Sequence, residues 1–413
     1  MVSNITAYNL SIFNQLQPSV SDVRHKSFSK EKHRQTFLND MKKPRVLFIL
    51  HLPPPTYGAT IVGEYIRQSK LINEEFEADY INLATNKVLT QLGKGSVKKM
   101  ITFAGILQQV FMALSRKKYD LCYITLTATG AAFYKDLAIV SVVKMFRKKI
   151  IYHFHNKGIS ASKSKFNNTL YRYAFKETKS ILLSRYLYPD IKNYVSEKNV
   201  YFCPGGIPAG RQSSIEKKET TAETANTPCQ LLFLSNMMRE KGIFILLDAC
   251  KKLKEKNISF ECHFIGGWVD VTKEEFDALI QEKNLTDVVF AHGPKYNEEK
   301  LAWYRKADVF LFPTFYHYEA FPLVNLEAMQ YSLPIVSTPE GGIPEMVVDG
   351  ETGFLVPQQD VEALAQKLTL LIEDPFLRLK MGEAGKRRFY ECFTIETFEQ
   401  NLAGILKKAI ADN

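Results

Sequence analysis

The sequence lacks most features that mark secreted, metal-binding and membrane-spanning proteins. Its six cysteines form no Cys-x-x-Cys pair and no ladder of short spacings. This argues against a zinc ribbon or a disulfide scaffold and fits a reducing cytoplasm. Residues 1–20 have neither the basic start nor the apolar core of a signal peptide. The best candidate for a membrane span, Ile101–Leu114, is only 14 residues long and contains Gln108 and Gln109, so no transmembrane helix is expected.

Two short motifs are also missing. No Gly-x-Gly-x-x-Gly occurs in the first strand-to-helix loop, so the usual dinucleotide fingerprint is absent there. No Asp-x-Asp occurs anywhere, so the usual carboxylate pair for a metal-bridged diphosphate is missing, and we expect no metal site and no cofactor. The remaining composition is ordinary for a globular protein, with 46% hydrophobic and 24% charged residues, which excludes wholesale disorder. The length of 413 residues indicates two domains.

The charge is divided unevenly along the chain. Residues 1–210 hold 31 Lys and Arg against 13 Asp and Glu, whereas the remainder holds 23 against 31. A basic first half favours an anionic partner, either a membrane surface or an acidic substrate, although a solvated basic face would give the same count. We expect no nucleic-acid partner, because no zinc-finger or RNP-type signature accompanies the charge.

Apolar runs and amphipathic stretches define the organisation. Residues 1–40 are polar and non-periodic and are interpreted as a partly ordered extension. Residues 41–210 alternate strand-like runs, beginning with Val46–Leu50, with helical stretches, which predicts βαβ units and a parallel sheet. Residues 211–230 have linker composition. A second strand–helix series fills 231–390, and 391–413 is expected to be a helix that packs back on the first domain.

The predicted fold class is therefore α/β, with two Rossmann-like domains in tandem. Ligands of such domains bind at the carboxyl ends of the strands, so loops that follow strands are the candidate site. The first of these loops follows Val46–Leu50 and contains Gly58 and Ala59 before a helix, where backbone amides suit an anion, although a plain β–α turn would look the same. The second follows Lys149–Phe154 and places His155 at the strand end, on the same face as His153.

The third loop, Ser235–Gly242, follows the strand Leu231–Leu234. It contains Asn236, Arg239 and Lys241 just before a helix. Two cations at the positive end of a helix dipole are unfavourable unless an anion lies between them, which suggests a phosphate, although a solvated Arg-Glu-Lys turn is also common.

The fourth loop follows the strand Val309–Phe312 and is the most informative. Glu319 precedes a helix start marked by Pro322, and Glu327 lies within that helix. Carboxylates suit sugar hydroxyls, and helix amides between them suit phosphate, so a nucleotide-sugar would satisfy both.

These residues resemble a known family. Glu319 and Glu327, separated by seven residues, match the E-x7-E motif of retaining glycosyltransferases of family 4. The flanking run from Ala307 through Gly353–Val356, the pair Lys241-Gly242, and the segment Cys203–Pro208 also resemble that family. The match extends from about Arg45 to the C-terminus; it is dense in 231–357 and sparse in 45–210.

The resemblance implies a GT-B fold, a nucleoside-diphosphate-sugar donor and transfer with retained anomeric configuration. It assigns the donor ribose to Glu327, the diphosphate to Lys241, and the transferred sugar to Glu319 and His155. Further donor contacts are implied for Gly58, Ala59, Asn236, Arg239, Pro294, Lys295, Phe321, Leu323 and Val324. Two positions depart from the family pattern: Asn236 replaces its usual arginine, for which Arg239 is the candidate substitute, and Gly58-Ala59 replaces a glycine pair.

The expected function is a cytoplasmic, metal-independent transferase that acts on a lipid-linked or polysaccharide precursor of a surface glycan. Other classes stay open, namely a sugar-nucleotide 2-epimerase, a phosphorylase-like enzyme and a non-catalytic nucleotide-sugar-binding subunit. A phosphorylase would need a pyridoxal-binding lysine motif, which we do not find. Stabilisation by a donor without turnover would indicate the binding subunit.

A membrane partner is the last expectation. Apolar residues of Met100–Leu114 recur at nearly helical spacing, and basic residues flank them at 94–99 and 116–118. Such a helix could lie in an anionic lipid surface, peripheral to the inner face of the membrane. The alternative is a helix that packs its apolar stripe on the first domain's core.

Overall fold

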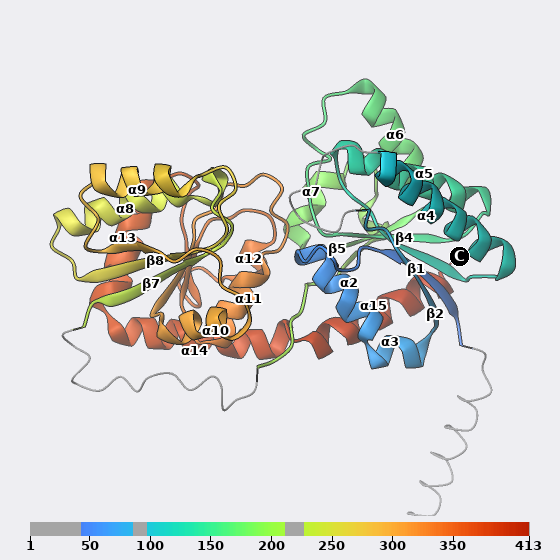
Figure 1. Cartoon of the computed structure of the whole chain (residues 1–413). Coiled ribbons are helices and arrows are strands. Elements are labelled where there is room, and N and C mark those ends of the chain that lie inside the picture. Colours follow the sequence, from blue (N-terminus) through green and yellow to red (C-terminus); the bar gives the residue numbers. More distant parts are fainter. Residues whose placement is uncertain (1–42, 86–96, 211–226, 413) are drawn as a thin grey trace, which may run out of the picture. The chain divides into compact units, whose positions relative to one another are not determined.

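The computed structural model describes residues 43–85, 97–210 and 227–412 (Figure 1). The extension expected at 1–40 and most of the linker expected at 211–230 lie outside the described residues. All described helices and strands fall within Arg45–Asn413, which forms one compact unit.

The first sheet is parallel and has the strand order β2-β1-β3-β4-β5-β6. Its strands are β1 (Arg45–Leu50), β2 (Glu77–Asn82), β3 (Leu121–Thr125), β4 (Ile150–Phe154), β5 (Lys179–Leu182) and β6 (Val200–Phe202). The connecting helices are α2 (Gly58–Gln68), α3 (Lys70–Glu75), α4 (Val97–Arg116), α5 (Gly130–Met145), α6 (Lys165–Phe175) and α7 (Tyr188–Ile191). All residues of β3 and β4 are buried, which explains their continuous apolar runs.

The second sheet is also parallel and has the order β12-β11-β10-β7-β8-β9. Its strands are β7 (Cys229–Leu234), β8 (Phe260–Ile265), β9 (Val289–Ala291), β10 (Val309–Phe312), β11 (Ile335–Ser337) and β12 (Gly353–Leu355). The helices are α8 (Ile243–Glu255), α9 (Lys273–Glu282), α10 (Asn297–Lys306), α11 (Leu323–Gln330), α12 (Ile343–Met346), α13 (Val361–Glu373) and α14 (Pro375–Cys392). In both sheets the central strands meet where the strand order reverses, which is where this class of sheet binds ligands.

The last helix, α15 (Ile395–Ala411), belongs to the core of the first sheet (Figure 1). Phe398, Leu402 and Leu406 are buried in one cluster with Val46 and Tyr123 from β1 and β3. The chain therefore returns to its first sheet after completing the second.

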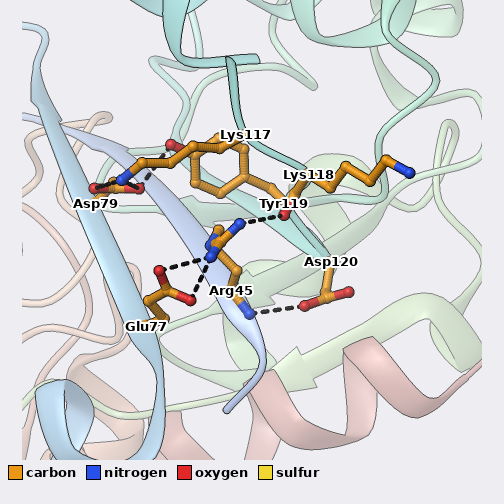
Figure 2. Close-up of polar contacts among 7 residues, drawn as sticks. All are labelled: Arg45, Glu77, Asp79, Lys117, Lys118, Tyr119 and Asp120. Carbon is orange, nitrogen blue, oxygen red and sulfur yellow. Dashed lines mark hydrogen bonds and ion pairs between the residues drawn. The ribbon is translucent and has the colours of Figure 1, made fainter. Parts of the chain in front are cut away.

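Polar groups close the amino-terminal edge of the first sheet (Figure 2). Arg45 donates two 2.7 Å hydrogen bonds to the Glu77 carboxylate, and its backbone N–H donates to Asp120 at 2.7 Å. Lys117, just after α4, forms a 2.8 Å ion pair with Asp79, which also accepts a 2.7 Å bond from the Tyr119 hydroxyl. These contacts fix the end of α4 against β2.

Candidate donor-binding site

Lys241 is held by the backbone geometry of its loop. It ends a short 3-10 turn, Arg239–Lys241, and Gly242 follows in the left-handed region with φ 88°. A Cβ atom at Gly242 would lie 2.1 Å from the Pro313 carbonyl oxygen, so only glycine fits. The Lys-Gly pair thus allows the loop after β7 to pack directly on the loop after β10.

Lys241 and Glu319 meet at this contact. The Lys241 ammonium forms an ion pair with a Glu319 carboxylate oxygen, and both side chains are only 12% exposed. The ammonium also lies over the rings of Tyr316 and Phe312, 4.5 Å and 5.4 Å from their centroids. The structure therefore joins two residues that the sequence assigned to neighbouring parts of one ligand, the diphosphate and the sugar.

Two glycines hold the Glu319 loop from the other side. Gly341 has φ 56°, and a Cβ there would lie 2.2 Å from the Glu319 carbonyl oxygen. The Gly342 N–H donates a 2.7 Å hydrogen bond to the Ala320 carbonyl. The Gly-Gly turn after β11 consequently fixes the backbone of the residues that carry Glu319 into α11.

Glu327 lies on α11 and has its own partners. Its carboxylate accepts hydrogen bonds from the Lys300 ammonium at 2.6 Å and the Tyr304 hydroxyl at 2.8 Å, both from α10. Burial and the negative charge of Glu327 hold the pKa of Tyr304 well above its usual value. The pKa of Tyr65 on α2 is also raised, mainly by burial and secondly by the negative charge of Glu327. Glu319 and Glu327 thus face different cations.

The backbone between the two glutamates is only partly enclosed. Pro322 is the N-cap of α11 and provides no side-chain capping bond. The Phe321 side chain is buried, whereas Leu323 and Val324 are half-buried. This leaves the first turn of α11 without a side chain that caps its amides, an arrangement that favours an anion.

His155 lies directly after β4 and is half-buried. Desolvation lowers the pKa of His155 to about 4, so its imidazole is neutral at pH 7. Its ring is 4.3 Å from that of His153, centroid to centroid, as their shared strand face predicts. His153 is fully buried, and its Nδ1 lies 2.5 Å from the Tyr123 hydroxyl. His153 is therefore part of the sheet core, while His155 reaches the strand end.

Gly58 and Ala59 form the first turn of α2. The Thr60 side chain stabilises this turn by accepting a 2.9 Å hydrogen bond from the Tyr57 N–H. A Cβ added at Gly58 would meet no atom within 4 Å. Packing within the described residues therefore does not require a glycine at position 58, in contrast to Gly242 and Gly341.

The remaining predicted donor contacts are exposed or are paired with other residues. Arg239 is 49% exposed and its guanidinium bonds Glu275 on α9 at 2.5 Å. Asn236 is exposed, as is Pro294. The Lys295 ammonium lies 3.7 Å from a carboxylate oxygen of Glu299. Arg239 is therefore paired with Glu275, whereas Lys241 from the same turn is paired with Glu319.

Several polar residues near the site were not singled out from the sequence. Lys300 and Tyr304 are four residues apart on α10, a spacing that places them on one helix face and is a usable signal. Lys157 forms an ion pair with Glu340, and the Ser184 hydroxyl donates to Glu345 at 2.9 Å. No local motif marks these last two contacts. Within the described residues, no group of three or more His, Cys, Asp or Glu side chains is arranged to hold a metal ion.

Comparison with solved structures identifies the fold. A glycosyltransferase from Rickettsia africae aligns with a TM-score of 0.67 at 17% identity, over 90% of this chain and all of that one. HepE from Anabaena, solved in complex with UDP, aligns with a TM-score of 0.66 at 18% identity, over 88% of this chain and all of that one. The chain has the GT-B fold. The expected pair of Rossmann-like domains is confirmed.

Sequence similarity is concentrated in the second half of this GT-B protein. Residues 214–388 match the family described as "Glycosyl transferases group 1". A protein of Escherichia coli K12 named as a colanic acid biosynthesis glycosyltransferase is 35% identical over 34% of this chain and 36% of its own. The capsular polysaccharide biosynthesis glycosyltransferase CapM of Staphylococcus aureus is 30% identical over 41% of this chain and 43% of its own. The matches span less than half the length of these relatives.

Proposed function

We propose that this protein is a retaining glycosyltransferase that moves a sugar from a nucleoside-diphosphate sugar to a hydroxyl group of a surface-glycan precursor. The observation that supports this most directly is the group formed by Lys241, Glu319 and Glu327 beside the first turn of α11. The group offers a cation from the loop after β7 and two carboxylates beside a helix start that no side chain caps. The named relatives, which are glycosyltransferases of colanic acid and capsule biosynthesis, support a surface glycan as the product.

The proposed roles follow from charge and position. Lys241 and the amides of Phe321, Leu323 and Val324 bind the diphosphate, Glu319 and His155 bind the transferred sugar, and Glu327 binds the ribose. Gly58-Ala59, Asn236 and Arg239 complete the phosphate contacts, and Pro294-Lys295 flank the base. A neutral His155 suits contact with a sugar hydroxyl, because its imidazole both donates and accepts hydrogen bonds.

The proposed reaction proceeds on one face of the sugar. The acceptor oxygen bonds to the anomeric carbon as the bond from that carbon to the phosphate oxygen breaks. That oxygen keeps the electron pair and takes the proton of the acceptor hydroxyl, so the configuration is retained. The sequence has no Asp-x-Asp, and Lys241 with the helix amides neutralises the charge on the leaving diphosphate. The proposed enzyme needs neither a metal nor another cofactor.

The first experiment tests the donor. UDP-, GDP- and ADP-sugars are compared by thermal shift, followed by calorimetry with the best of them and by assay of donor hydrolysis. Glu327→Ala should weaken donor binding by about 1.5–3 kcal/mol, because a charge-assisted contact is lost. Unchanged affinity in a folded Glu327→Ala protein would contradict the ribose assignment. Binding of a donor without hydrolysis or transfer would favour a binding subunit, and release of a 2-epimeric sugar would favour an epimerase.

We propose that the protein acts at the inner face of a membrane through α4. Ile106, Val110 and Leu114 face the core, as expected for a packed helix. Met100 and Ile101, however, are 72% and 69% exposed at its start. Within the described residues no helix is long and apolar enough to cross a bilayer. Peripheral contact through these exposed apolar residues and the basic groups at the two ends of α4 fits both observations.

Liposome co-sedimentation at low and high salt tests this contact. Arg116→Glu with Lys118→Glu should reduce binding to anionic vesicles severalfold, because each basic group contributes about 1 kcal/mol. Lys117 is left unchanged, since its reversal would break the ion pair with Asp79 (Figure 2). Lys192→Glu with Lys198→Glu changes the net charge equally at other exposed positions and serves as the control. Equal loss in both variants, or binding indifferent to salt, would refute the assignment.

A further inference from the structure

A small cavity lies beside the proposed reaction centre. Its volume is about 200 Å³. Its walls come from the start of α5, the loop after β4, α6 and the loop that leads to Glu319. The residues that line it are Thr129, Gly130, Phe133, Tyr134, Gly158, Ala161, Ser162, Asn167, Tyr171 and Tyr318. Tyr318 immediately precedes Glu319, and Gly158 is three residues after His155. The cavity is therefore joined by the chain to both residues proposed to bind the transferred sugar.

The chemistry of the lining is unusual for this protein. Within the described residues it contains no Lys, Arg, Asp or Glu, although the surrounding half of the chain is strongly basic. Four aromatic rings and several hydroxyl and amide groups make up most of its surface. Tyr134 and Tyr318 are 45% and 43% exposed, so two of the lining aromatic residues are accessible to a ligand. An anionic group placed here would lose hydration without gaining a cation.

The walls are held in place by contacts of their own. The Tyr134 hydroxyl donates a 2.8 Å hydrogen bond to the Asn167 side chain, and the Tyr171 hydroxyl donates at 2.8 Å to the Ala128 carbonyl. Gly158 has φ 129°, and a Cβ there would lie 2.8 Å from the Tyr318 ring. Asp190 accepts bonds from the backbone N–H groups of Gly158 and Ser160 at 2.9 Å each, which fixes this loop. Tyr134 and Tyr318 are thus held in place before a ligand binds.

From this lining we infer that the cavity binds one neutral sugar ring, the terminal unit of the acceptor glycan. The inference rests on the proposed transferase function and adds the class of acceptor. The C–H face of a pyranose packs on an aromatic ring, whose face is electron-rich, while its hydroxyls bond to amide and hydroxyl groups. The volume is below the roughly 300–1,000 Å³ of pockets for larger ligands, which suits a single ring. A phosphorylated or carboxylated sugar does not suit the uncharged lining.

The test is saturation-transfer-difference NMR on the full chain with methyl α- and β-glycosides of glucose, galactose, mannose and N-acetylglucosamine. Glucose 1-phosphate and glucuronic acid are the charged comparators. At least one neutral glycoside should give a signal, and the charged sugars should give none. Tyr134→Ala should weaken binding about five- to tenfold, since a stacked ring is lost. Ala161→Trp should abolish the signal by filling the cavity from an exposed position.

Tyr173→Ala is the matched control, because Tyr173 is 43% exposed on α6 but does not line the cavity. No neutral glycoside signal, an unchanged signal in both cavity variants, or preference for a charged sugar would each overturn the inference. Calorimetry with UDP, GDP and ADP is run on the same proteins. Nucleotide binding should persist in the cavity variants. Failure of the wild-type chain to bind any nucleotide would instead refute the proposed donor site.

Discussion

The carboxyl ends of the two sheets present different chemistry. In the second half, charged groups occur as ion pairs, as with Lys241–Glu319 and Lys300–Glu327, on loops that glycines lock together. In the first half, the strand ends carry His51 and His155, whose burial lowers the pKa to about 3 and about 4. The adjoining cavity is uncharged. The strand ends of the second sheet therefore carry paired charges, and those of the first carry neutral imidazoles beside an uncharged cavity.

The two halves also differ in whether packing requires their glycines. It does at Gly242 in the second half and does not at Gly58 in the first. Gly242→Ala should lower the free energy of unfolding by about 2–4 kcal/mol, through a left-handed backbone and overlap with the Pro313 carbonyl. Gly58→Ala should change it by less than about 1 kcal/mol, because the position is open. Denaturant titration of both variants measures the difference. Equal destabilisation would show that the loops after β7 and β10 are not locked as described.

Lys241→Ala removes the cation that pairs with Glu319. Turnover should fall about 100-fold or more, because one electrostatic contact to the leaving diphosphate is lost. Steady-state rates with the best donor give the measurement, and Arg239→Ala, which removes the other proposed phosphate cation of this turn, is measured beside it. A near-normal rate for Lys241→Ala together with a large loss for Arg239→Ala would move the phosphate role to Arg239.

Acid should destabilise the protein through its buried histidines. The unfolded state binds protons near pH 6.5, whereas His51, His155 and His263 have pKa values of about 3, 4 and 4 when folded. The free energy of unfolding that these neutral histidines contribute is fully present above about pH 6.5. It is lost as the pH falls toward 4, by up to about 1.4 kcal/mol per pH unit for each histidine. Urea unfolding between pH 7.5 and 5 measures the slope. His155→Asn should reduce it, and an unchanged slope would contradict the neutral assignment.

Glu319→Gln should give the smallest change in binding, and it separates the effect of this carboxylate on nucleotide binding from its effect on sugar transfer. Glu319 forms an ion pair with the Lys241 ammonium, the group that we propose binds the diphosphate. Removing the negative charge should tighten binding of the free nucleoside diphosphate about fivefold, while transfer slows because a sugar contact is lost. Calorimetry measures the nucleotide affinity and a steady-state assay of the same preparation measures the transfer rate. Weaker nucleotide binding would show that the carboxylate does not compete with the ligand.

The sequence predicted most elements that position the site. Val309–Phe312 forms β10 as expected, because a fully buried parallel strand is a continuous apolar run. Helix limits depend on caps that the apolar pattern does not show. α2 ends at Gln68, because the Ser69 side chain caps α3 by accepting a hydrogen bond from the Ile72 N–H. α15 begins at Ile395, because the Thr394 side chain caps it by accepting from the Thr397 N–H.

The partners of the candidate residues were harder to predict. Glu327 contacts Lys300 and Tyr304, which lie on another helix, so the pairing depends on how α10 and α11 pack. The cavity is a stronger example, since Tyr134, Asn167 and Tyr318 come from three separate segments. A lone exposed tyrosine has no signature in sequence. Only the fold shows that Tyr134 and Tyr318 line the same cavity.

The position of α15 has a consequence for the synthesis of the protein. The first sheet is translated before the second, yet Val46 and Tyr123 are covered by Phe398, Leu402 and Leu406. The second sheet and its helices, which end at Cys392, are complete before that cover exists. Domains usually fold in the order in which they emerge from the ribosome. In this chain the half that emerges first is the last to be finished, because its core waits for Ile395–Ala411.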